Sequence, residues 1–183
     1  MARGLRSLAL VGVLVVAAAS GGLAEGTKSF HLNGLINDHT VPTFGSWEVH
    51  GVWSLEVDTQ SNRADFNAEL TMERSDLYFV DTPSADPGNP AMRNAHTHHI
   101  AVRDAEVTAI AGGFRLTGPA DVTIITGNGF AAPFETKPPS STVQIDVTGG
   151  KIVTYSNVTL TFGGPAANHF GPNAVAGVVK SWK

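Results

Sequence analysis

Apolar and polar residues alternate along most of this chain with a period of two, which is the pattern of a β-strand that buries one face. In residues 47–58, for example, Trp53 and Leu55 fall on one face while Ser54 and Glu56 fall on the other. The same alternation recurs in later segments, and no stretch after residue 24 predicts an amphipathic helix. The pattern predicts eight strands, at about residues 28–33, 46–58, 63–80, 96–111, 113–126, 141–148, 151–162 and 174–182.

The connections between these strands alternate in length. Short turns are expected near residues 60–62, 112–113 and 149–150, and long connections at 33–45, 81–95, 127–140 and 163–173. If each strand runs antiparallel to the one before it, all the long connections lie at one end. We therefore predict an all-β, single-domain, antiparallel, eight-stranded up-and-down barrel, a closed form that leaves no exposed sheet edge. A two-sheet β-sandwich of the same strands is the alternative.

Residues 1–24 have the features of an export signal peptide. Arg3 and Arg6 provide a positive start, residues 8–19 form an apolar run, and Ala24 offers a small residue at a plausible cleavage point. The apolar run is shorter than the ~20 residues that a spanning helix needs, although an uncleaved membrane anchor is the alternative. Removing 24 of 183 residues leaves 159, which suits one barrel domain over residues 25–183. We expect a periplasmic or extracellular protein with no transmembrane segment in its mature chain.

Charge and cysteine content narrow the possible partners. The chain has 12 Lys and Arg residues, of which two lie in the predicted leader. The remaining ten basic residues and the 16 acidic residues give the mature chain a net charge of −6. An acidic chain without clustered basic residues is a poor match for nucleic acid. There is no cysteine, so the exported domain has to be stable without disulfides. No nucleotide-binding loop or hydrolase motif is present, and no stretch identifies a known family.

The histidines carry the candidate chemistry. Seven are present, and three of them lie in residues 96–99. His96 and His98 are two apart on a predicted strand, so their side chains point the same way, and they share their face with Ile100 and Val102. This face is expected to be the barrel interior. In the meander all seven histidines are expected near the end with the long connections.

Imidazole is a common ligand of zinc, copper and nickel, and two imidazoles on one strand face are close enough to share an ion. We predict His96 and His98 as the anchors of a ligand or metal site and His169 as the leading third partner. His39, His50 and Glu48 are further candidates, although His50 lies on the polar face of its strand. The sequence does not identify the metal, and a site for a small polar ligand remains open.

Three functions are consistent with these observations. The first is an exported barrel that binds a small ligand or a divalent metal, such as zinc, copper or nickel, through His96 and His98. The second is an enzyme in which a buried histidine or a metal-bound water performs acid–base or hydrolytic chemistry. The third is an envelope or extracellular interaction protein without a small-molecule site, whose histidines bond only to the backbone. The sequence does not determine the oligomeric state.

Overall fold

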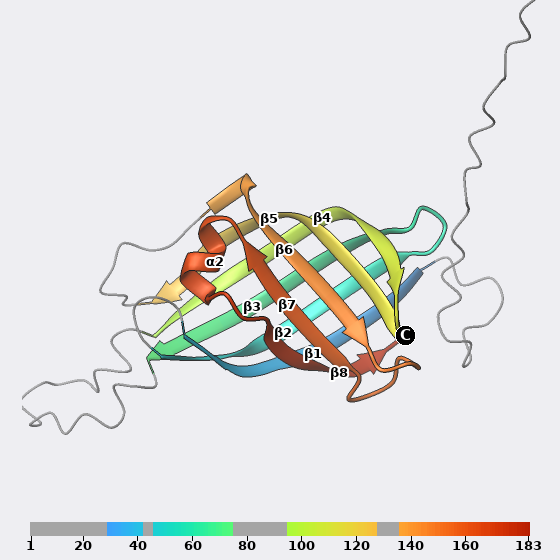
Figure 1. The fold of residues 1–183 in the computed structure, drawn as a ribbon, viewed down its shortest axis with the longest axis horizontal. Coiled ribbons are helices and arrows are strands. Elements are labelled where there is room, and N and C mark those ends of the chain that lie inside the picture. The colour runs from blue at the N-terminus through green and yellow to red at the C-terminus, as the bar shows by residue number, and fades with distance from the viewer. Residues whose placement is uncertain (1–28, 42–45, 75–94, 128–135) are drawn as a thin grey trace, which may run out of the picture.

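The computed structural model of the chain describes residues 29–41, 46–74, 95–127 and 136–183, and these residues form β-strands almost throughout (Figure 1). The predicted leader lies outside the described residues. The strands are β1 (Ser29–Thr40), β2 (Trp47–Asp58), β3 (Arg63–Arg74), β4 (His96–Ile110), β5 (Gly113–Gly127), β6 (Thr136–Thr148), β7 (Asn157–Gly163) and β8 (Val175–Trp182). One helix, α2 (Pro165–Phe170), lies between β7 and β8.

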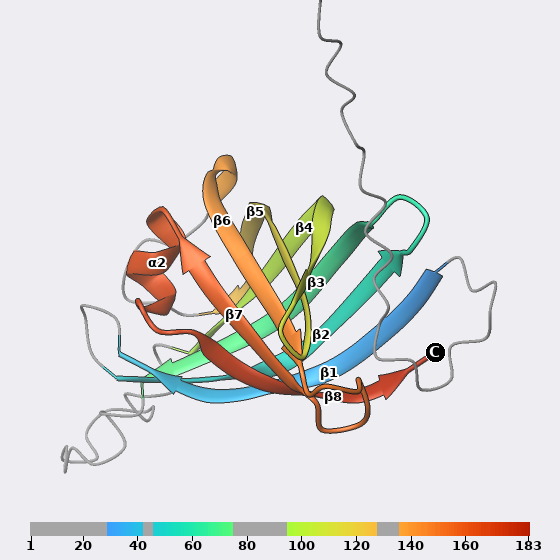
Figure 2. The same ribbon diagram turned by 45° about the vertical axis from the view of Figure 1, so that its right-hand side comes forward.

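The eight strands form a closed antiparallel meander, and this confirms the predicted barrel. Each strand pairs with the next one in sequence, and β1 also pairs with β8 (Figure 2). The β1–β8 ladder includes the pairs Leu32 with Trp182 and Ile36 with Gly177. Because this ladder joins the first strand to the last, the sheet has no free edge, and the two-sheet sandwich is excluded.

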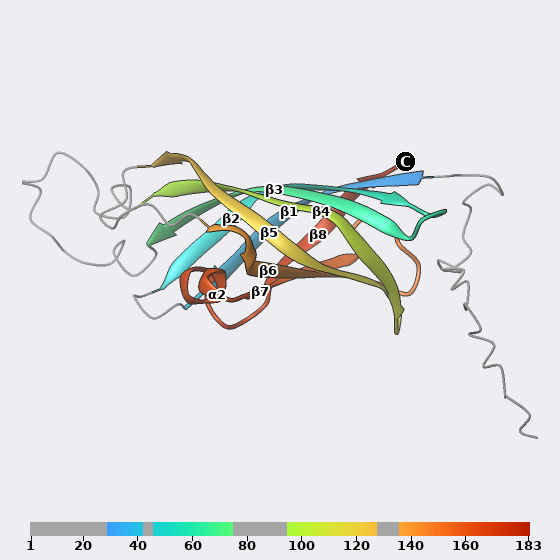
Figure 3. The same cartoon turned by 90° about the horizontal axis from the view of Figure 1, so that it is seen from above.

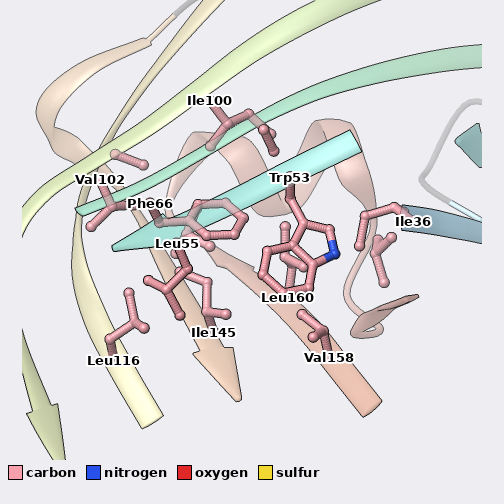
Figure 4. Close-up of a cluster of buried hydrophobic side chains, with 14 of the residues drawn as sticks. Ile36, Trp53, Leu55, Phe66, Ile100, Val102, Leu116, Ile145, Val158 and Leu160 are labelled. Carbon is pink, nitrogen blue, oxygen red and sulfur yellow. The ribbon is translucent and has the colours of Figure 1, made fainter. Parts of the chain in front are cut away.

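Alternation along the strands fills the barrel with apolar side chains. In β2, Trp53, Leu55 and Val57 are at most 3% exposed, whereas Glu56 and Asp58 between and after them are exposed. Figure 4 shows the centre of this core, where Trp53 lies near Phe66. Their rings stack with centroids 6.2 Å apart. Burial of each large apolar side chain contributes about 1.5–3 kcal/mol, so this interior is the main source of stability.

The barrel has two different ends. The end called here the turn end carries the connections β2–β3, β4–β5 and β6–β7, at residues 59–62, 111–112 and 149–156. The other, called the loop end, carries the start of β4 and the whole of α2. Figure 3 shows α2 and the C-terminus toward opposite ends of the barrel. The predicted grouping by length was wrong for two connections, since β6 and β7 are joined by residues 149–156 and β1 and β2 only by residues 41–46. The helix α2 lies in the predicted long connection 163–173.

Several predicted bounds were wrong, and each error has a local cause. β1 continues to Thr40 and β6 starts at Thr136, so two of the predicted loops are partly strand. Most polar residues there are on the outer face of a barrel strand, where they do not interrupt pairing, whereas Thr40 and Thr136 are buried. β7 starts only at residue 157, because the chain from 149 to 156 makes an irregular turn. The prediction of no helix missed α2, whose six residues are too few to show a helical period.

Within the described part of the chain, no helix has the length and apolar character that crossing a membrane requires.

Candidate metal centre

β4 carries His96 and His98 into the barrel interior at the loop end. The first seven residues of β4 alternate between buried and half-buried positions, and the two histidines occupy buried ones together with Ile100 and Val102. His96 is 8% exposed and His98 is 0% exposed. The rings are edge to face, with centroids 4.8 Å apart. Both histidines therefore point into the barrel from the same face of β4, as predicted.

The helix α2 supplies the third imidazole, and glycines define where it begins and ends. Gly164 precedes the helix with φ 65°, and a Cβ there would lie 2.3 Å from the carbonyl oxygen of Ser140. Pro165 follows at the first turn, where its missing N–H costs nothing. Gly171 ends the helix with φ 94° and donates its N–H to the carbonyl of Ala167. Only glycine adopts such backbone angles at low cost, so the position of α2 is fixed locally.

Two buried anchors hold α2 on the barrel. Ala166 and Phe170, one helical turn apart, are both 0% exposed. Phe170 stacks on Phe162 of β7 with ring centroids 4.1 Å apart, and its carbonyl accepts a hydrogen bond from the Thr40 hydroxyl. The N–H of Ala166 donates to Ser141 Oγ at 3.1 Å. Because His169 precedes Phe170 and lies three residues after Ala166, this docking presents its ring to the barrel interior.

The three rings converge on one point. His169 Nε2 lies 3.1 Å from His96 Nε2 and 2.9 Å from His98 Nε2. One possible ligand nitrogen from each residue lies within 4.8 Å of the other two. Among the described residues, this is the one group of three or more His, Asp or Glu side chains with such a spacing.

Hydrogen bonding between neutral imidazoles does not fully explain this arrangement. A nitrogen of a neutral imidazole either donates one hydrogen or accepts through one lone pair. His169 Nε2 has two other Nε2 atoms at hydrogen-bonding distance, and it can form a normal linear bond with only one of them. A cation at the centre would instead accept the lone pairs of all three nitrogens.

Two of the three separations between the nitrogens are close to those around a small transition-metal ion. With metal–nitrogen bonds of about 2.0–2.1 Å at tetrahedral angles, two ligand nitrogens are about 3.3 Å apart. The two separations from His169 Nε2, 3.1 and 2.9 Å, are within a few tenths of this value, and all three ligand atoms lie within 4.8 Å of one another. Three imidazoles without a carboxylate suit zinc, copper or nickel, and such a set leaves a tetrahedral ion one further position.

Burial keeps two of the rings in the form that binds metal. Burial, followed by the charges of His169 and His96, lowers the pKa of His98 from 6.5 to about 3, and a backbone hydrogen bond with Thr123 partly opposes the shift. Burial also lowers the pKa of His169 to about 4, with a contribution from the charge of His96. Both rings are thus neutral at pH 7, and neutral imidazole is the ligand form.

The remaining candidates lie elsewhere. His39 is on β1, not in a loop as predicted; its ring is exposed and bonds to the Ser46 hydroxyl. His50 is exposed on the outer face of β2, and Glu48 is exposed on the same strand. The expectation that all seven histidines lie at the loop end was wrong for His31. It faces Glu56 across β1 and β2 near the turn end, because β1 extends beyond its predicted bound.

Sequence reasoning missed the residues that position His169. Phe170, Phe162 and Ser141 dock the helix, and the rings of Trp47 and His96 meet edge to face with centroids 5.4 Å apart. A signal for the helix was present in the sequence. Proline at the first helical position and glycine just after the last are typical of helix ends, and Pro165 and Gly171 have this spacing. No sequence signal indicates the contact of Trp47 with His96.

Comparisons of this chain with protein-family models, with curated proteins and with solved structures found no match. The conclusions about function therefore depend on the site itself.

Proposed function

We propose that this protein is an exported metal-binding barrel that holds one transition-metal ion, zinc, copper or nickel, through His96, His98 and His169. The observation that carries the proposal is the convergence of three imidazole nitrogens from two separate elements, β4 and α2. Two of the three rings are neutral at pH 7, so protons compete little with a metal there. Export is supported by the leader-like composition of residues 1–24.

The other two functions have less support. An interaction protein without a site was expected to bond its inward histidines only to the backbone, whereas His96 and His98 contact the ring of His169. An enzyme that uses metal-bound water would exploit the open fourth position of a three-histidine site. The described group holds no carboxylate that could act as its general base, and His98 is fully buried. Binding therefore accounts for more of the geometry than hydrolysis does.

Isothermal titration of the purified protein with zinc, copper and nickel salts tests this function. We expect one ion per chain, and an affinity at least about 100-fold weaker in His96→Ala/His98→Ala, which removes two of three ligands. The matched control His50→Ala/His99→Ala removes an exposed and a half-buried imidazole outside the cluster and should bind as the wild type does. Equal affinity of the wild type and the His96→Ala/His98→Ala variant would contradict the proposal.

A further inference from the structure

Met72 lies directly beside the imidazole cluster. It is on β3 and pairs in register with His96 of β4, and it is 0% exposed on the interior face. Directly opposed residues on neighbouring antiparallel strands have Cβ atoms about 4.5–5.5 Å apart, and a methionine side chain reaches past that distance. Of the three methionines in the sequence, Met72 is the one within the described residues.

The contact between Trp47 and His96 also places Met72 in the wall of the site. Trp47 is on β2 and His96 on β4, and β3 lies between these strands. Their rings nevertheless meet edge to face with centroids 5.4 Å apart. The interior residue of β3 at this level is Met72, which pairs with Val49 on one side and His96 on the other. Met72 is therefore the buried residue of β3 at the level where the two rings meet.

The chemistry of a thioether distinguishes between metals. Zinc is held by imidazole, carboxylate or thiolate, whereas soft thioether ligands favour copper(I). The chain contains no cysteine, so methionine is its only sulfur ligand. Long, unbranched methionine side chains also adjust easily to irregular surroundings, which lets the sulfur move toward a bound ion.

We propose that Met72 is a fourth ligand, and that its thioether makes the three-histidine site selective for copper(I) over zinc. The inference rests on the proposed metal-binding function and specifies which ion the site takes. Imidazole and thioether ligands carry no negative charge, which suits a monovalent ion in an apolar setting better than a divalent one. With the sulfur bound, the fourth position is closed to water, so the site binds copper(I) and does not activate water for hydrolysis.

Two measurements on the full-length protein test the role of Met72. Copper(I) affinity is measured without oxygen by competition with bicinchoninate, and zinc affinity by competition with a zinc indicator dye. In Met72→Leu, which conserves volume, we expect copper(I) affinity to fall about tenfold or more while zinc affinity stays within about twofold. Ile100→Leu, a core change on β4 two residues beyond His98, is the control and should leave both affinities unchanged.

X-ray absorption of the copper(I)-loaded wild type is the second measurement and needs no variant. We expect a sulfur shell beside the imidazole nitrogens. A spectrum with nitrogen alone would overturn the proposal, as would equal copper(I) affinity in Met72→Leu and wild type or an equal loss of both metals in that variant. A wild type that binds zinc but shows no sulfur ligation leaves the metal-binding function intact. A wild type that binds neither metal refutes that function itself.

Discussion

The middle of the barrel and its loop end are built from the same strands but have different interiors. In the middle, Trp53, Phe66 and Leu116 are almost completely buried and contact other apolar side chains (Figure 4). At the loop end the interior contains polar groups. Of the six buried polar residues in the described part of the chain, five lie there: Thr40, His96, His98, Thr136 and Ser141.

These polar residues are of two kinds. The hydroxyls of Thr40 and Ser141 bond to the backbone of α2, and Thr136 bonds to Ser141, so their role is to hold the helix and the strand beside it. The imidazoles of His96 and His98 instead direct their Nε2 atoms at a third imidazole. Burying polar groups without full hydrogen bonding costs stability, and proteins keep such clusters mainly where function requires them. The difference between the two kinds is our reason for placing the function at the imidazoles.

The largest expected effect separates the two regions directly. Phe66→Ala removes a large, fully buried ring from the middle of the barrel, far along β3 from Met72 at the loop end. We expect the free energy of unfolding to fall by about 3–5 kcal/mol, through lost burial and the cavity left behind. Urea unfolding measured in EDTA and again in excess zinc should show the same loss in both.

The loss in Phe66→Ala is informative because zinc should still stabilise this variant. An ion present at 100 times its dissociation constant adds about 2.7 kcal/mol to a protein that binds it only when folded. If Phe66→Ala also abolished this gain, the interior would behave as one unit, and the contrast between the two regions would be wrong.

The barrel itself could be predicted from the sequence, because alternation with a period of two is a local property of each strand. Trp53, Leu55 and Val57 show it within five residues. The inward direction of His96 and His98 follows from the same rule, since they alternate in phase with Ile100. The presence of eight strands with long and short connections was then enough to favour closure.

The completion of the site was harder to predict, because it depends on contacts between residues far apart in sequence. His169 lies 71 residues from His98, and it reaches the ring only because Phe170 and Ala166 dock a six-residue helix on the barrel. The sequence indicates His169 as a candidate but offers His39 and His50 on equal chemical grounds. His39 is excluded because β1 extends beyond its predicted bound and places that ring on the outside. His50 is excluded by the alternation along β2, which places it on the outer, polar face as predicted.

Acid should weaken the metal-free protein through its loop end. The pKa values of His98 and His169 are lowered in the folded state to about 3 and about 4, whereas an unfolded histidine titrates near 6.5. Between about pH 4 and 6.5 the unfolded chain therefore binds more protons. Stability is complete above about pH 6.5 and is lost as the pH falls. We expect a loss on the order of 3 kcal/mol between pH 6.5 and 4.5.

Chemical denaturation in EDTA across this pH range measures the loss. The outward-facing control His50→Ala removes an imidazole that water reaches and should keep the wild-type slope, whereas His98→Leu should flatten it. A wild-type stability that is constant from pH 6.5 to 4.5 would mean that burial does not keep the rings of His98 and His169 neutral. The interior at the loop end would then be as accessible to water as the protein surface.

The smallest expected change in stability comes from replacing the most buried imidazole by an apolar side chain of similar size. His98→Leu leaves His96 and His169 with a single Nε2 pair at 3.1 Å, which one ordinary hydrogen bond satisfies. In EDTA at pH 7 we expect the free energy of unfolding to change by no more than about 1 kcal/mol, in either direction. The variant loses the contacts of the ring but no longer has the cost of burying a polar group, and the two effects offset each other.

The same variant should lose the stabilisation by zinc, which urea unfolding with and without the metal measures. A metal-free loss of more than about 2 kcal/mol would instead identify His98 as a structural part of the core. Stability and function are separable at this position only if the three rings are kept for an ion, and this variant measures the two independently.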